Sequence, residues 1–393
     1  METLYRDLNS LVIFRHILQA APMQNLLKLL ACPQDNADAL CGAYADFAAE
    51  LLAEDCNFSR YLLRLVLEDE NIYTRYKTTG EGDAQVLDPL LNRELNLLSR
   101  AAAFDGSTQR AALGDPTLAA WQTEPLDFYK IYHERLGEMS TKGFGIFAKY
   151  HMFMLDDAGA LVPIKNPDPQ KLSELFGYER ERGKIIANTK ALLEGKPANN
   201  VLLYGDAGTG KSSTVKAIGN EFAKDGLRLV ELKKNQLYLI PGLLDTLAVN
   251  PLKFILFIDD LTFASDDRDF CALKAILEGG VSSRSNNVLI YATSNHRHMI
   301  KETNADRQGD EISITDKLQE IVSLSARFGL TITFSRPDKM LYSDIVVHLA
   351  REAGIDMDED TLIVRAEAHA IRSGGRNPRT AKQFVDLLAA GVV

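Results

Sequence analysis

The stretch that most constrains the fold of this chain is Gly-Asp-Ala-Gly-Thr-Gly-Lys-Ser at residues 205–212. It follows four apolar residues that predict a short buried strand, and it precedes a segment of helical character. A strand, a glycine-rich loop and a helix in this order form the setting in which a phosphate-binding loop works. Glycine tolerates the positive φ angles that turn successive backbone N–H groups toward one centre, and the helix adds the positive end of its dipole. The stretch therefore predicts a site for the phosphates of a nucleoside triphosphate.

Two side chains of this loop carry its chemistry. Lys211 brings a full positive charge for the β- and γ-phosphates, and Ser212 brings a hydroxyl that can ligate Mg²⁺. The alternative interpretation is a glycine-rich turn with a surface lysine, and the flanking strand and helix argue against it. We expect the nucleotide to be held by Gly205, Asp206, Ala207, Gly208, Thr209, Gly210, Lys211, Ser212 and Ser213.

A pair of carboxylates follows a second apolar run, at residues 254–258. Open α/β sheets bind ligands outside the carboxyl ends of their strands, which is where Asp259 and Asp260 would lie. We expect Asp259 to orient the Mg²⁺ coordination sphere, directly or through water, and Asp260 to polarise an attacking water. Two aspartates after a strand are weak evidence alone, but downstream of a phosphate loop they indicate a functional pair.

Three further residues are candidates for the same site. Asn295 ends an apolar strand that begins at residue 288, and it could hold the attacking water or a γ-phosphate oxygen, or only form a turn. Arg327 precedes the last predicted strand, so it would lie away from its own phosphates and could reach the nucleotide of a neighbouring subunit; a surface arginine is the alternative. Arg379 falls in the first turn of the final helix, where the dipole disfavours a cation and an anionic partner is indicated, with Arg376 as its competitor.

The pattern of apolar residues divides the chain into three parts. Residues 1–165 are mainly helical and end in a predicted hairpin, 149–154 with 160–164, before an Asn-Pro-Asp-Pro connector. In residues 166–336 short apolar runs alternate with helical stretches, which predicts a parallel sheet buried on both faces. Its expected strands are 201–204, 227–232, 254–258, 288–292 and 330–334. Residues 337–393 predict three helices, 339–353, 358–373 and 378–390.

Composition excludes few functions. The net charge of −10 over 393 residues gives no global attraction for nucleic acid, although it does not exclude a local basic patch. No apolar run is long enough to span a membrane, the first residues do not resemble a signal peptide, and the cysteines show no CxxC spacing, so we expect a reducing cytoplasm. Buried thiols are expected at three cysteines among apolar helical residues, Cys32, Cys41 and Cys56.

Taken together, these motifs resemble those of the AAA+ ATPases. Residues 205–212 resemble Walker A and 254–260 Walker B, while Asn295, Arg327 and Arg379 look like sensor 1, the arginine finger and sensor 2. The resemblance covers residues from about 170 to 393 and also includes a segment that would pack on adenine, with Phe176, Gly177 and Tyr178. More narrowly, residues 195–206, 273–280 and 292–295 look like a bacterial AAA+ family known only as a domain of unknown function, which has a similar helical N-terminal region.

The resemblance implies an α/β fold: a parallel five-stranded P-loop sheet with a C-terminal helical lid, preceded by a mainly α-helical N-terminal domain. It implies ATP and Mg²⁺ as cofactors and a homo-oligomeric ring, with six subunits as the expected number. The implied function is ATP hydrolysis at subunit interfaces that remodels a protein partner held by residues 1–165. A DNA-associated loader-type ATPase is an alternative, for which the sequence offers only two-residue basic clusters at 233–234 and 297–298.

Two departures from the AAA+ pattern bear on activity. Asp260 stands where Walker B usually has glutamate, and its shorter side chain favours slow hydrolysis or the second alternative, a nucleotide-dependent switch or scaffold with little hydrolysis. Residues 238–242, Tyr-Leu-Ile-Pro-Gly, match the aromatic–hydrophobic–glycine pore loop of unfoldases only imperfectly, so we expect them to pack rather than to grip a substrate.

Overall fold

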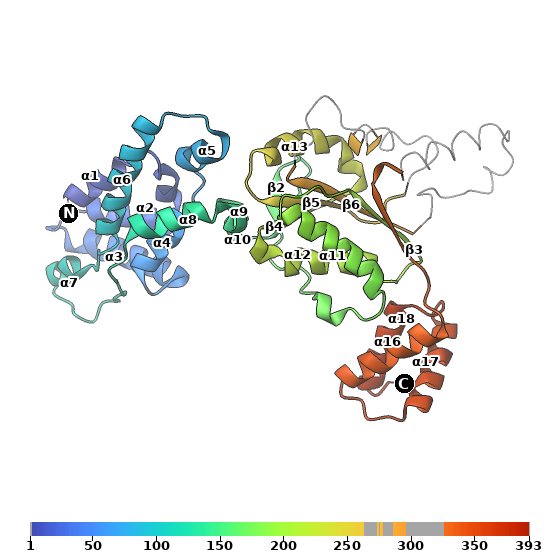
Figure 1. Ribbon diagram of the computed structural model, residues 1–393. Coiled ribbons are helices and arrows are strands. Elements are labelled where there is room, and N and C mark those ends of the chain that lie inside the picture. The colour runs from blue at the N-terminus through green and yellow to red at the C-terminus, as the bar shows by residue number, and fades with distance from the viewer. Residues whose placement is uncertain (1, 263–272, 275, 278–285, 296–325, 393) are drawn as a thin grey trace. The chain divides into compact units, whose positions relative to one another are not determined.

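The computed structural model describes residues 2–262, 273–274, 276–277, 286–295 and 326–392. The chain forms two compact units, Met1–Lys149 and Tyr150–Val393 (Figure 1). Each unit has its own buried core, and each is described by itself below.

The first unit is helical, as its apolar periodicity predicts. Asparagine and aspartate side chains begin several of its helices by accepting hydrogen bonds from backbone N–H groups of the first turn, as at Asn36, Asn71 and Asp127. The elements are α1 (Glu2–Asn9), η1 (Arg15–Gln19), α2 (Ala21–Ala31), α3 (Ala37–Glu54), α4 (Phe58–Glu68), α5 (Ile72–Thr79), α6 (Ala84–Ala101), α7 (Ser107–Leu113), α8 (Phe128–Gly137), α9 (Met139–Lys142) and α10 (Ile146–Lys149).

An aromatic cluster lies in the core of this unit. The Phe47 ring meets Trp121 edge-on with centroids 4.8 Å apart, and it meets Phe58 edge-on at 5.7 Å. Edge-to-face pairs of this kind stabilise a core beyond the area that they bury. The Trp121 indole N–H donates to the carbonyl of Phe104 at 2.8 Å, so its polar atom is satisfied. Trp121 is the only tryptophan of the chain, so its fluorescence reports on this unit alone.

A buried carboxylate holds the turn between α1 and η1. Glu94 of α6 is 0% exposed, and its two oxygens accept from the backbone N–H groups of Val12 at 2.7 Å, Ile13 at 3.0 Å and Phe14 at 3.1 Å. These N–H groups precede a short 3₁₀ helix and have no helical partner of their own. Glu94 therefore acts as a side-chain cap supplied from a distant part of the sequence.

Replacing Glu94 by alanine is expected to lower the free energy of unfolding of the first unit by about 3 kcal/mol or more, because it leaves buried backbone donors without acceptors. Urea unfolding followed by Trp121 fluorescence measures this. Glu134→Ala, at an exposed position of α8, is the control and should stay within about 0.5 kcal/mol of the wild type. Equal stability of the two variants would contradict the role given to Glu94.

The second unit is built on one seven-stranded sheet of order β2-β1-β4-β5-β6-β3-β7. Its strands are β1 (Met152–Leu155), β2 (Leu161–Pro163), β3 (Val201–Gly205), β4 (Leu227–Leu232), β5 (Lys253–Ile258), β6 (Val288–Ser294) and β7 (Leu330–Phe334). All neighbours pair in parallel except β1 with β2. The five strands predicted for residues 166–336 are therefore confirmed as a parallel set, and their carboxyl ends meet at one edge.

The sheet has seven strands rather than the five expected, because the predicted hairpin joins its edge. Met152, Phe153 and Met154 of β1 pair in parallel with residues 229–231 of β4, which places the hairpin in the second unit. The division of the chain accordingly falls after Lys149 and not near residue 165. The local sequence predicted the two strands of the hairpin. It did not predict the pairing of β1 with β4, which depends on a contact between segments distant in sequence.

Helices cover both faces of the sheet (Figure 1). α11 (Glu179–Leu193) and α12 (Lys211–Glu221) pack on one face, where Ile185, Val215 and Ile218 meet side chains of β3, β5 and β6. α13 (Ile240–Ala248) covers the other face, and the short turns η2 (Leu172–Glu174), η3 (Ala223–Asp225) and η4 (Lys234–Leu239) connect these elements. Burial on both faces explains why the central strands are almost continuously apolar.

Three helices follow β7: α16 (Lys339–Glu352), α17 (Glu359–Arg372) and α18 (Pro378–Ala389). They share a small core of their own, with Tyr342, Ile345, Leu362 and Phe384. We call them the C-terminal helical subdomain. Among the helices that the structure describes, none combines the length and the apolar character needed to cross a membrane.

The cysteines differ from expectation. Cys32 is partly buried, and Cys41 and Cys56 are exposed, so the expected burial of these thiols is wrong. Cys41 lies on α3, whose many alanines surround the helix and mark no single apolar face. Cys271 lies outside the described residues.

Candidate functional site

The glycine-rich loop joins β3 to α12 and has the backbone that its glycines predict. Gly205, Gly208 and Gly210 adopt φ angles of 138°, 80° and 89°, which other residues rarely take. Thr209 donates its hydroxyl hydrogen to the carbonyl of Asp206 at 2.8 Å, which closes the loop on itself. Ala207 is exposed within it, and α12 begins directly after Gly210. The loop thus presents the amino end of a helix at the carboxyl edge of the sheet.

Lys211 is buried under this loop and is only 6% exposed. Its ammonium donates to three oxygens: the carbonyls of Gly205 at 3.0 Å and Asp206 at 2.8 Å, and Oδ1 of Asn295 at 3.0 Å. Burial lowers the pKa of Lys211, and the nearby carboxylates of Asp206, Asp259 and Asp260 oppose that shift. An anionic ligand at the loop would add to this opposition, so the site favours a phosphate on electrostatic grounds.

The two aspartates after β5 lie beside α12 and β6. Oδ1 of Asp259 accepts from the hydroxyls of Ser212 and Thr293, both at 2.6 Å. Asp260 is exposed, and its Oδ1 accepts from the amide of Asn295 at 2.9 Å. The structure therefore brings together Lys211, Ser212, Asp259, Asp260 and Asn295, which lie up to 84 residues apart in sequence. Parallel strand order explains this, because β5, β6 and β3 are adjacent and end at the same edge.

Ser212 and Asp259 suit Mg²⁺ by their chemistry. Both offer hard oxygen atoms, and the 2.6 Å hydrogen bond between them places those atoms on a common side of the loop. In the part of the chain that the structure describes, no group of three or more His, Cys, Asp or Glu side chains could hold a metal ion. A pair of protein ligands fits Mg²⁺ that is also held by substrate phosphates and water. Ser213 follows in the first turn of α12 and is half-buried.

Of the two competing arginines at the start of α18, Arg376 just before it and Arg379 in its first turn, Arg379 is the one at the loop. Its backbone N–H donates to the carbonyl of Gly208 at 3.3 Å, and its side chain is exposed. Arg376 instead forms a two-pronged ion pair with Glu367, with contacts of 2.8 and 2.9 Å. The approach is close: a Cβ on Gly208 would lie 2.7 Å from Oδ1 of Asn377, the residue that caps α18. A glycine is needed at this point of the loop.

The segment expected to pack on adenine lies where the core meets the C-terminal helical subdomain. Phe176 stacks on His348 of α16 with ring centroids 4.3 Å apart, and a Cβ on Gly177 would touch Leu341 of the same helix. Tyr178 adopts a positive φ of 61°, and its hydroxyl donates to the carbonyl of Ser335 at 2.6 Å. Burial raises the pKa of Tyr178 to about 12, so the hydroxyl keeps the proton that it donates.

Arg327 does not belong to this cluster. It precedes β7 by three residues, and Leu330 pairs with Val201 at the start of β3, whereas Phe334 pairs with Gly205 at its end. A strand of this length spans about 16 Å. Arg327 therefore lies toward the amino ends of the strands, away from the phosphate loop of its own chain. The basic pair at residues 297–298 lies outside the described residues.

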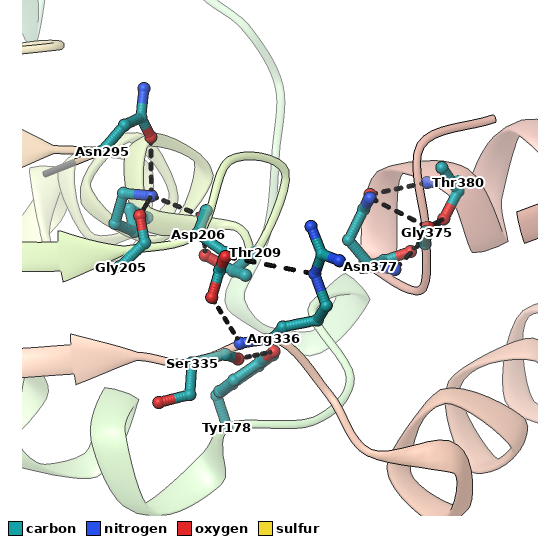
Figure 2. Close-up of polar contacts among 11 residues, drawn as sticks. Tyr178, Gly205, Asp206, Thr209, Asn295, Ser335, Arg336, Gly375, Asn377 and Thr380 are labelled. Carbon is teal, nitrogen blue, oxygen red and sulfur yellow. Dashed lines mark hydrogen bonds and ion pairs between the residues drawn. The ribbon is translucent and has the colours of Figure 1, made fainter. Parts of the chain in front are cut away.

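Sequence reasoning missed two polar contacts of the site. Thr293 of β6 bonds Asp259, but a threonine in an apolar strand carries no motif signal. Arg336 follows β7, and its backbone N–H donates to Oδ2 of Asp206 at 2.9 Å while its Nε lies 4.0 Å from Oδ1. Figure 2 shows the Arg336 side chain between Asp206 on one side and Gly375 and Asn377 on the other. Only the folded arrangement brings these residues together.

The expectation for residues 238–242 is wrong at its aromatic residue. Tyr238 is 65% exposed, whereas the flanking Leu237 and Ile240 are fully buried. Leu237 and Ile240 supply the buried apolar contacts of this segment, and the Tyr238 side chain faces solvent.

Residues 148–392 match a protein family described as Protein of unknown function (DUF815). The match covers most of the chain and confirms the narrower of the two resemblances drawn from the sequence. The fold is also similar to that of the RuvB Holliday junction branch migration motor of Thermotoga maritima, with 16% identity, a TM-score of 0.37, and coverage of 57% of this chain and 67% of RuvB. AMPPCP-bound DnaA from Aquifex aeolicus is similar with 17% identity, a TM-score of 0.40 and the same coverage.

Proposed function

Since this chain belongs to the family described as Protein of unknown function (DUF815), we propose its function from the site itself: it is an ATPase of the AAA+ type. The observation that carries the proposal is the cluster at the carboxyl edge of the sheet. There a buried lysine under a glycine-rich loop, a serine–aspartate pair and an asparagine–aspartate pair are joined by hydrogen bonds. These groups serve phosphate binding, cation binding and activation of water respectively.

The loop and Lys211 would bind the phosphates. The ammonium now satisfies two loop carbonyls and Asn295, and it would turn toward the β- and γ-phosphate oxygens of ATP. Ser212 and Asp259 would hold Mg²⁺, which when bound neutralises charge on those oxygens. Arg379 would add a further positive charge from the C-terminal helical subdomain.

Asp260 would orient and polarise the attacking water. Its positive φ of 52° turns the backbone directly after β5, and the Asn295 amide holds one of its oxygens. Asn295 also accepts a hydrogen bond from Lys211. Its side chain would therefore link the phosphate-binding lysine with Asp260, the proposed general base. The same hydrogen bonds favour a second candidate, a nucleotide-dependent switch with little hydrolysis, because they keep one oxygen of an already short carboxylate engaged.

The site would be completed by a second copy of the chain. Arg327 lies toward the opposite edge of the sheet, so only the Arg327 of a neighbouring subunit could reach this nucleotide. We propose a homo-oligomeric ring in which hydrolysis moves the C-terminal helical subdomain, as a lid, against the core. The N-terminal unit would hold a protein partner that this motion remodels.

Asp260→Asn tests the proposed base. The amide keeps the size of the side chain but cannot take up a proton, so ATP affinity should stay within about threefold of the wild type while turnover falls about 100-fold or more. Binding of a fluorescent ATP analogue and steady-state phosphate release measure the two quantities. Asp157→Asn, in the exposed β1–β2 turn, is the control and should change neither. Full turnover in Asp260→Asn would show that another group is the base.

A further inference from the structure

The hydroxyl of Thr293 contacts both aspartates that follow β5. Its Oγ1 donates to Oδ1 of Asp259 at 2.6 Å and accepts from the backbone N–H of Asp260 at 2.9 Å. The carbonyl of the same residue accepts from the N–H of Leu261 at 2.7 Å. Thr293 is 2% exposed, so these contacts are shielded from water. A single residue of β6 thus fastens three consecutive residues of the neighbouring strand end.

The hydrogen of this hydroxyl and one of its two lone pairs are engaged by the two aspartates. A threonine hydroxyl has one hydrogen and two lone pairs. Its hydrogen goes to the Asp259 carboxylate, which makes this a strong, charge-assisted bond, and a lone pair receives the Asp260 N–H. Oδ1 of Asp259 also accepts from Ser212 and, at 3.2 Å, from the N–H of Asp260, so three donors fix that oxygen and leave Oδ2 as the freer one.

The backbone of Asp260 depends on such support. Its φ of 52° lies in the left-handed region, which costs a non-glycine residue free energy and persists only where the surroundings impose it. Two hydrogen bonds to Thr293 hold the peptide groups on either side of this residue. The N–H of Asp260 donates to the Thr293 hydroxyl, and the N–H of Leu261 donates to the Thr293 carbonyl. They place the Asp260 side chain where Asn295 reaches it at 2.9 Å.

We propose that Thr293 is a positioning residue of the site: its hydroxyl sets the orientation of Asp259 toward Ser212 and the Mg²⁺ position, and it holds Asp260 in its turned conformation. This inference rests on the proposed function, since it concerns the same nucleotide site. One measurable consequence distinguishes this positioning role from a purely structural role of a buried threonine. Loss of the hydroxyl should weaken the response of nucleotide binding to Mg²⁺ and leave the phosphate loop itself intact.

The test compares Thr293→Val, which keeps the shape and removes the hydroxyl, with Thr293→Ser, which keeps the hydroxyl. A fluorescent ATP analogue is titrated into the full-length chain with Mg²⁺ and with EDTA. For Thr293→Val we expect the affinity in EDTA to stay within about twofold of the wild type, and the gain in affinity from Mg²⁺ to shrink about tenfold. Thr293→Ser should keep that gain within about threefold. Thr293→Ala serves as a second hydroxyl-free variant if the valine variant does not fold.

Two results would overturn the inference alone: a wild-type Mg²⁺ response in the hydroxyl-free variants, or an equal loss in the valine and serine variants, which would point to shape. A wild-type chain that binds the analogue in neither condition overturns the proposed function as well. The two failures are therefore distinguishable in one experiment.

Discussion

Gly205→Ala is expected to disrupt the second unit and to abolish nucleotide binding. Gly205 ends β3 with a φ of 138°, and a Cβ there would lie 2.1 Å from the carbonyl oxygen of Phe334 and 2.7 Å from its carbon. No rotamer relieves this overlap, because both partners are backbone atoms of the paired strands β3 and β7. Strained backbone and overpacking each cost about 1–3 kcal/mol, so the free energy of unfolding should fall by about 3 kcal/mol or more.

Urea unfolding followed by circular dichroism measures the change, and Trp121 fluorescence shows whether the first unit is spared. Gly183→Ala is the matched control, because this glycine lies inside α11 and a Cβ there would meet nothing within 4 Å. Alanine favours a helix interior, so the control should be as stable as the wild type or up to about 1 kcal/mol more stable. A Gly205→Ala protein within about 1 kcal/mol of the wild type would contradict the close packing of β3 against β7.

Lys211→Ala should have the largest effect on nucleotide binding at the least cost in stability. The ammonium donates hydrogen bonds to two carbonyls of the phosphate loop, and we expect its loss to weaken binding of an ATP analogue about 100-fold or more. Because burial lowers the pKa of Lys211, its charge is unfavourable in the free protein, and the variant should fold with similar stability.

Lys184→Ala, at an exposed position on α11, is the control and should bind the analogue like the wild type. Equilibrium titration monitored by fluorescence gives both affinities. Near wild-type binding in Lys211→Ala would mean that the nucleotide does not sit on residues 205–212.

Much of the site was predictable because parallel strands share one edge. The loop after β3 and the polar residues after β5 and β6 were recognisable from local sequence, and their convergence followed from strand order. Contacts between distant elements were not predictable. Arg336 meets Asp206 because β7 pairs with β3, and Asn377 meets Gly208 because the C-terminal helical subdomain reaches the loop.

Other features could not be predicted from the sequence because they depend on tertiary contacts. In the sequence Thr293 resembles any β-branched residue of a buried strand. Its role comes from hydrogen bonds to Asp259 and Asp260, which follow the neighbouring strand β5. The hairpin of β1 and β2 was visible in the sequence, but its pairing with β4 was not. The contacts of Glu94 are tertiary in the same way, because the turn at residues 12–14 lies 80 to 82 residues away in sequence.

The most direct test of the central claim is steady-state phosphate release from ATP, measured with Mg²⁺ over a wide range of protein concentration. We predict release that depends on Mg²⁺, is absent in Lys211→Ala, and rises per subunit with concentration. The rise follows from the proposal that the Arg327 of a second copy completes the site. Release that never exceeds the Lys211→Ala background at any concentration would contradict the assignment of this chain as an ATPase.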